Sequence, residues 1–193
     1  MVAVSNVGKR FGHRWLFRGL TFEVTQGHGL VVLGRNGSGK STLLKLIASL
    51  LPPSEGAVRY DFQSPRVDIG YAALDLALYP QMTVREHLEF CGRVRGCPSR
   101  ADELLELIGL ARADATPSAQ LSSGMRARLK LGMALQPRPK LLLLDEPGAS
   151  LDADGRELVA GICREQLKSG ALLVATNDPQ ERAFATHELE LAG

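Results

Sequence analysis

Residues 30–53 read LVVLGRNGSGKSTLLKLIASLLPP, two apolar segments joined by a glycine-rich turn. The first four residues are all apolar, which indicates a buried strand. After the turn, leucines and isoleucine recur at helical spacing as far as Leu51, and Pro52 and Pro53 are predicted to end that helix. The turn matches G-x-x-x-x-G-K-[ST], with Gly34, Gly39, Lys40 and Ser41 at the fixed positions.

The composition of this turn suits a bound polyphosphate. Glycines allow backbone N–H groups to point at an anion, and the following helix adds the positive end of its dipole. We expect Lys40 to reach the β- and γ-phosphates and the Ser41 hydroxyl to bind Mg²⁺. A chance match is the alternative, but the strand before and the helix after the turn favour nucleotide binding. The predicted contacts are Gly34, Asn36, Gly37, Ser38, Gly39, Lys40, Ser41 and Thr42.

Two acids follow another apolar strand, in the stretch LLLLDEP of residues 141–147. Adjacent side chains at a strand end point in opposite directions, so Asp145 and Glu146 can serve different tasks. We expect Asp145 to take part in holding Mg²⁺ and Glu146 to polarise a water aimed at the γ-phosphorus. The alternative is a solvated acidic turn. This is the weaker interpretation because four leucines precede the acids and the chain also contains a phosphate loop.

Apolar segments and helical patterns alternate along the chain, which predicts an α/β fold with a mostly parallel sheet. Thr83 and Ser99 are predicted to cap helices in the helical region 83–136, and another helix is expected at 155–168. We expect an N-terminal β region and a helical subdomain, residues 75–125, inserted in the core. Strands are predicted at residues 2–7, 20–25, 30–34, 57–62, 66–72, 140–145 and 171–176.

Composition excludes several other classes of protein. A net charge of +2 gives no argument for a nucleic acid partner, so none is expected. No apolar run approaches the roughly 18–20 residues that span a bilayer, and the N-terminus lacks the apolar core of a signal peptide. The three cysteines, Cys91, Cys97 and Cys163, form no CxxC pair and are expected to be reduced thiols.

Three stretches and one single residue resemble the ABC ATPase family, the ATP-binding subunits of ABC transporters. LSSGM, residues 121–125, is similar to the family signature LSGGQ at three of five positions. LLLLDEPGASLD resembles the Walker B strand, catalytic glutamate and D-loop. Residues 69–88 resemble the loop that enters the helical subdomain, and Phe11 lies where the family places an aromatic residue against adenine. The order of these motifs agrees over nearly all of residues 1–193, which implies a single P-loop NTPase domain.

The resemblance implies an enzyme that binds and hydrolyses ATP with Mg²⁺. It also implies a head-to-tail homodimer or heterodimer in which Ser122 and Gly124 of one subunit contact the γ-phosphate bound to the other. A basic helix with a polar face is the alternative for this stretch. A separate transmembrane permease would hold the subunit at the inner face of the cell membrane. In its shortness, the chain resembles the small haem-exporter subunits used in cytochrome c biogenesis.

The chain departs from the family pattern at two informative places. Asn177 stands where the family usually has a histidine that contacts the γ-phosphate, and Leu74 stands where a glutamine would approach Mg²⁺. An asparagine can donate a hydrogen bond to a phosphate oxygen but cannot become cationic. With Lys40 and Glu146 intact, slow hydrolysis is expected. Asp75 or Gln81 is an alternative ligand from the same loop, although solvated positions are favoured, and His187 is expected to be a surface residue.

Other functional classes remain as alternatives. A switch or scaffold that dimerises on ATP and barely hydrolyses it is favoured by Asn177 and Leu74, and opposed by Glu146. A GTPase would need N-K-x-D, and the stretch TNDP at residues 176–179 lacks the lysine. A small-molecule kinase would explain the phosphate loop but not LSSGM before LLLLDEP.

Overall fold

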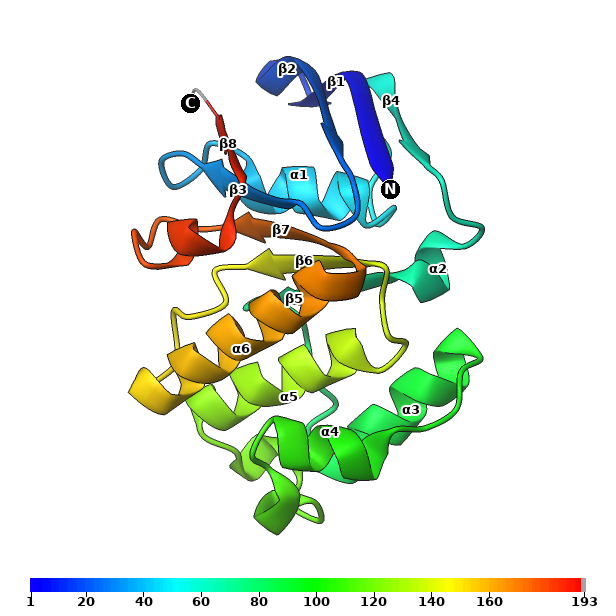
Figure 1. Cartoon of the computed structure of the whole chain (residues 1–193), viewed down its shortest axis with the longest axis vertical. Coiled ribbons are helices and arrows are strands. Elements are labelled where there is room, and N and C mark those ends of the chain that lie inside the picture. Colours follow the sequence, from blue (N-terminus) through cyan, green and yellow to red (C-terminus); the bar gives the residue numbers. More distant parts are fainter. Residues whose placement is uncertain (192–193) are drawn as a thin grey trace.

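Two β-sheets enclose the helix after the glycine-rich turn in the computed structural model, which describes residues 1–191 (Figure 1). The larger sheet is parallel, with the strand order β5-β6-β7-β3-β8. Its strands are β3 (Gly29–Leu33), β5 (Ile69–Ala73), β6 (Leu141–Asp145), β7 (Ala171–Ala175) and β8 (His187–Glu190). The smaller, antiparallel sheet has the order β2-β1-β4, from β1 (Val2–Phe11), β2 (Arg14–Val24) and β4 (Glu55–Tyr60). The predicted fold class is confirmed.

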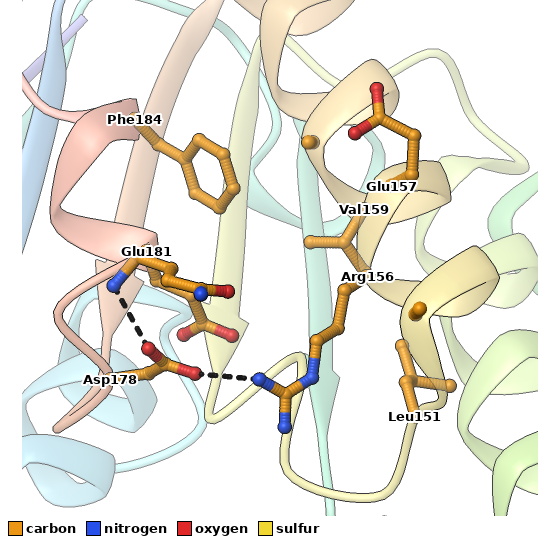
Figure 2. A pocket seen from close by; sticks show the side chains of 10 residues that line it. Leu151, Arg156, Glu157, Val159, Asp178, Glu181 and Phe184 are labelled. Atoms are coloured by element: carbon orange, nitrogen blue, oxygen red, sulfur yellow. Dashed lines mark hydrogen bonds and ion pairs between the residues drawn. The ribbon is translucent and has the colours of Figure 1, made fainter.

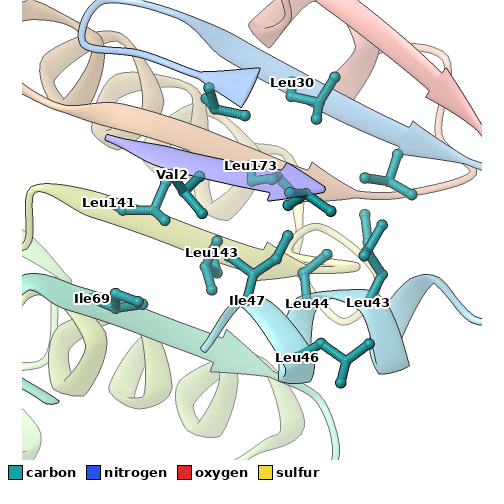
Figure 3. Close-up of a cluster of buried hydrophobic side chains, with 14 of the residues drawn as sticks. Val2, Leu30, Leu43, Leu44, Leu46, Ile47, Ile69, Leu141, Leu143 and Leu173 are labelled. Carbon is teal, nitrogen blue, oxygen red and sulfur yellow. The ribbon is translucent and has the colours of Figure 1, made fainter. Parts of the chain in front are cut away.

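Helix α1 (Lys40–Ile47) fills the space between the two sheets (Figure 3). Its apolar side chains pack against β5, β6 and β7 on one side and against β1 and β2 on the other. Each fully buried leucine or isoleucine contributes roughly 1.5–3 kcal/mol through the apolar area it removes from water. This packing fixes the helix, and with it the turn that precedes it. The buried side chains of α1 are Leu43, Leu44, Leu46 and Ile47.

The opposite face of the parallel sheet is covered by α5 (Ser123–Leu135) and α6 (Ala153–Ser169), as Figure 1 shows. Strands β6 and β7 are buried at every position, as expected for central strands covered on both faces. Helix α6 begins two residues earlier than predicted because the Asp152 carboxylate caps it by accepting from the Gly155 N–H at 2.9 Å.

A third apolar cluster holds α3 (Val84–Arg95) and α4 (Ala101–Leu107) against α5. Thr83 caps α3 as predicted, in a capping box with Glu86. The predicted cap of the next helix is wrong by one residue: Arg100 is the N-cap, and the Ser99 hydroxyl only accepts from the Ala101 N–H at 3.3 Å. The short helices are α2 (Pro65–Asp68), η1 (Ala111–Ala113), η2 (Ser118–Gln120) and η3 (Glu181–Phe184). The bounds 75–125 for an inserted subdomain stay a prediction.

Three other local predictions need correction. Helix α1 ends at Ile47, well before the prolines, because Ser49 adopts a left-handed conformation (φ 57°) that breaks the helix. The segment 66–72 is not one strand: Pro65 starts the helical turn α2, and β5 follows it. Strand β8, at the edge beside β3, was not predicted. Its residue His187 is exposed, as expected.

The three cysteines are free, as predicted. Between residues 1 and 191, none of the helices combines the length and apolar character needed to cross a bilayer.

Candidate nucleotide site

The glycine-rich turn joins the buried end of β3 to the first turn of α1. Gly39 is the N-cap residue of α1, with a φ of 103° that other residues rarely adopt. A side chain at this position would also lie within 2.8 Å of the Leu16 side chain at the start of β2. The glycine in the motif therefore serves both the backbone conformation and the close approach of the antiparallel sheet.

Lys40 joins three segments that are far apart in the sequence. Its side chain is only 7% exposed, and its ammonium donates to the Gly34 carbonyl at 2.8 Å. The same ammonium donates to the amide oxygen of Asn177 at 3.2 Å and lies 3.6 Å from a Glu146 carboxylate oxygen. The turn, the end of β6 and the end of β7 therefore meet at one cation, at the carboxyl edge of the parallel sheet, where α/β proteins bind ligands.

Asn177 lies beside the turn, as its position after β7 predicted. Its amide nitrogen donates to the side-chain oxygen of Asn36 at 2.9 Å, while its oxygen accepts from Lys40. The side chain is thus adjacent to the residues expected to hold phosphate. Its contact with the γ-phosphate stays a prediction.

The paired acids face different partners, as predicted for the end of a strand. Glu146 lies on the Lys40 side and has a left-handed backbone (φ 50°), held by its N–H donating to the Ala175 carbonyl at 2.8 Å. Asp145 lies on the Ser41 side. Burial raises the pKa of Asp145, and a hydrogen bond with the Ser41 hydroxyl opposes that increase.

The donor set at Asp145 fits Mg²⁺. Among the described residues, the buried Oδ1 of Asp145 has no hydrogen-bond partner, although a buried polar atom normally has one. A carboxylate and a hydroxyl are hard oxygen ligands, and Mg²⁺ is usually held by one or two carboxylates together with substrate phosphates. Asp145 and Ser41 would hold the ion.

The rest of the turn also matches a phosphate cradle. Ser38 is buried, and its hydroxyl oxygen has no partner within residues 1–191. Gly37 and Asn36 are exposed, and Thr42 is half-buried in the first turn of α1. The unpartnered Ser38 hydroxyl is available to an anion that enters the turn.

The signature residues lie at the start of α5, on the face of the sheet opposite α1 (Figure 1). Ser122 is the N-cap of α5, and its hydroxyl accepts from the Met125 N–H at 3.2 Å. The Gly124 Cα faces the Ser150 carbonyl of the loop after β6 closely enough that an added Cβ would lie 3.3 Å from it. Arg128 pairs with Asp152 at 2.9 Å. The signature of one chain is therefore fixed to its own D-loop and begins a helix on the other side of the sheet from its own phosphate loop.

Phe11 is at the tip of the β1–β2 hairpin and is 56% exposed, with the Lys9 ammonium 5.3 Å from its ring centroid. The same hairpin brings Leu16 and Phe17 against Gly39. An exposed aromatic ring near the phosphate loop suits stacking on a base, and this role stays a prediction.

The next contacts concern Leu74, which stands where the family has a glutamine, and its neighbours in the same loop. The Leu74 side chain is 46% exposed, and its backbone carbonyl accepts from Lys130. Asp75 pairs with Lys45 of α1 at 2.6 Å, and Gln81 is exposed.

Sequence reasoning missed two residues of the loops around the site, Gly148 and Glu181. The Glu181 carboxylate accepts from the Gly148 N–H at 2.8 Å and is only 6% exposed. Gly148 lies within the stretch LLLLDEPGASLD but was assigned no role there, and a single glutamate in a polar segment carries no signal of burial.

Comparison with known proteins identifies the family. Residues 17–149 match the family model described as ABC transporter. The chain is 38% identical to the cytochrome c biogenesis ATP-binding export protein CcmA of Rhodopseudomonas palustris, over 87% of each protein. It is 39% identical to CcmA of Bradyrhizobium diazoefficiens, over 94% of this chain and 93% of the relative.

A solved structure of an ATP-binding cassette, dimeric and bound to ADP and Pi in a post-hydrolysis state, has a TM-score of 0.87 with 27% identity. That likeness covers 99% of this chain and 94% of the cassette. With the phosphate loop, the acid pair and the signature all in place, the chain belongs to the ABC transporter family, as an ATP-binding subunit with ATPase activity.

Proposed function

We propose that the chain hydrolyses ATP at two composite sites of a head-to-tail dimer and thereby drives a separate transmembrane permease. The contact of Lys40 with both Glu146 and Asn177 carries this proposal, because it gathers a phosphate-binding cation, a general base and a hydrogen-bonding amide at one edge of the sheet.

Each residue has a distinct task in this proposal. Lys40 leaves the carboxylate and amide that hold it and binds the β- and γ-phosphates. Glu146, released from the ammonium, polarises the attacking water. Mg²⁺, when bound by Asp145 and Ser41, neutralises charge on the phosphates. Asn177 donates a hydrogen bond to the γ-phosphate.

The second half of the site comes from another subunit. Ser122 and Gly124 begin α5, and a helix N-terminus attracts anions. They lie on the opposite face of the sheet from their own phosphate loop, so a second chain would supply them. A homodimer satisfies this arrangement, and so does a heterodimer with a related subunit.

A groove between the core and the helical region supports the permease proposal. It has a volume of about 430 Å³ and is lined mainly by apolar residues of β5, of α3 and of the segment that follows α1.

 Three exposed apolar side chains lie in or beside this groove, namely Leu50 (59%), Tyr79 (58%) and Val94 (44%). Exposed apolar surface in a groove is typical of a site for a partner protein. We infer that a permease segment docks here, which would hold the subunit at the inner face of the cell membrane.

The two relatives in cytochrome c biogenesis match the chain over most of their length, which supports the small haem-exporter type. The chain is also 37% identical to a taurine import ATP-binding protein of Sinorhizobium fredii. The permease, rather than this subunit, is therefore proposed to determine the cargo.

The test is Mg²⁺-dependent ATP turnover by the purified chain at several protein concentrations, beside a Glu146→Gln control. We expect turnover that rises more than linearly with concentration and vanishes in the control. Tight ATP binding without turnover at any concentration would favour the alternative of a dimerising switch. That alternative is supported by Asn177 and by Leu74 in the place of a glutamine.

A further inference from the structure

Glu181 is a buried acid that the proposed steps of hydrolysis do not use. It begins η3, four residues after Asn177, and is 6% exposed. One carboxyl oxygen, Oε1, accepts from the Gly148 N–H at 2.8 Å. The other, Oε2, is buried without a hydrogen-bond partner in the part of the chain that the structure describes. Such a group is costly to bury, so the single contact that it makes requires an explanation.

Gly148 belongs to the loop that starts at Glu146. An added Cβ at residue 148 would overlap Oε1 of Glu181, so glycine provides the space for the carboxyl group. The loop is closed by two backbone bonds, from the Ala149 N–H to the Glu146 carbonyl at 3.2 Å and from the Leu151 N–H to the Gly148 carbonyl at 3.1 Å. A restraint on Gly148 is therefore transmitted to Glu146 through Pro147, the one residue between them in this tight turn.

The other end of the contact is fixed to the segment that carries Asn177. The Glu181 N–H donates to the Asp178 carbonyl at 3.1 Å, and the Asp178 N–H donates to the Thr176 hydroxyl at 2.9 Å. Arg156 of α6 pairs with the Asp178 carboxylate at 3.2 Å. Asp178, Glu181 and Arg156 line a pocket of about 560 Å³, and Figure 2 shows Asp178 and Glu181 on one side of it and Arg156 on the other.

We propose that Glu181 is a positioning residue for ATP hydrolysis, which holds the Glu146 loop in register with the Asn177 segment. The proposal rests on the role of Glu146 proposed above. The left-handed backbone of Glu146 supports it, because such a conformation persists only where the surrounding structure fixes it. Two restraints do so here: the bond from the Glu146 N–H to the Ala175 carbonyl, and the bond from Gly148 to Glu181.

The test compares Glu181→Leu with Glu181→Gln, and uses Glu157→Gln as the matched control. Leucine fills the site without an acceptor, whereas glutamine keeps an oxygen for the Gly148 N–H. Glu157 lines the same pocket but is exposed and paired with Arg164. We expect Glu181→Leu to lower kcat by about 10- to 100-fold, as misplacement of a catalytic group does. KM for ATP should change little, Glu181→Gln should retain most of kcat, and Glu157→Gln should match the wild type.

Three results would overturn the proposal: an unchanged kcat in Glu181→Leu, equal losses in the leucine and glutamine variants, or a loss confined to KM. Gly148→Ala provides a second approach if Glu181→Leu does not fold, and it should lower kcat in the same way. A Glu146→Gln variant measured in parallel separates the two hypotheses. If that variant keeps full turnover, the role of Glu146 fails, whereas normal turnover in the Glu181 variants alone rejects only the positioning role.

Discussion

The Lys40 ammonium lies 3.2 Å from the amide oxygen of Asn177, across a separation of 137 residues in the sequence. The amide nitrogen of the same side chain is directed at Asn36, 2.9 Å away. Asn177 therefore links two residues of the phosphate loop, and its amide must exchange these partners when a phosphate enters.

Asn177→His is expected to raise kcat for ATP, because an imidazole can become cationic beside the γ-phosphate and an amide cannot. One well-placed donor to a transition state is worth about 10²–10³ in rate, and the asparagine already supplies a donor, so a smaller gain is expected. Steady-state turnover at saturating Mg²⁺-ATP measures it. Asn177→Ala is the control and should fall below the wild type. Equal kcat values for all three proteins would reject the placement of Asn177 at the γ-phosphate.

Thr83→Ala should destabilise the protein by about 1 kcal/mol, because the capping box at the start of α3 loses one of its two bonds. The Thr83 hydroxyl accepts from the Glu86 N–H at 3.2 Å, and the Thr83 N–H donates to the Glu86 carboxylate at 2.8 Å. Urea unfolding with an unchanged m-value measures the loss. Thr83→Ser keeps the hydroxyl and should recover most of the stability; a serine variant as weak as the alanine variant would contradict the capping role.

The motifs and the strands that carry them could be predicted from the sequence because both signals are local. A strand of four leucines followed by two acids specifies β6, and the glycine-rich turn specifies the start of α1. Both acids and Lys40 meet where the parallel strands end, which follows from the topology.

The remaining features depend on tertiary contacts and had no local signal. Helix α1 ends at Ile47 because Ser49 turns left-handed, although the apolar pattern continues to Leu51. The burial of Glu181 depends on Gly148, which is 33 residues away. The short edge strand β8 is mostly exposed, so it shows no apolar run.

Stability should depend on pH through Glu181. Burial raises the pKa of Glu181, and the charges of Asp178 and Glu146 act in the same direction, whereas the neighbouring Thr176 side chain and the Gly148 N–H oppose the increase. Arg156 and Cys163 of α6 also face this group. The folded state holds the proton more tightly than the unfolded state. The contribution of this group is therefore full below its ordinary pKa of 4.5 and is lost as pH rises through the raised value.

Glu181→Gln removes this titration, so the stability of the variant relative to the wild type should increase as pH rises above about 4.5. Urea unfolding of both proteins across that range measures the difference. Glu157→Gln, at an exposed position, should show no such trend. A difference between Glu181→Gln and the wild type that is constant with pH would contradict the raised pKa.

Two inactive variants should restore turnover when they are mixed, if each site combines the phosphate loop of one chain with the signature of another. Lys40→Ala removes the phosphate cation, and Gly124→Asp places a negative charge at the start of α5, where the partner's γ-phosphate is expected. Each variant alone has two defective sites per dimer. A mixed dimer has one site with both defects and one with neither, so an equal mixture should recover up to about a quarter of wild-type turnover when pairing is random. Turnover of the mixture no greater than that of the separate variants would show that each chain works with its own signature.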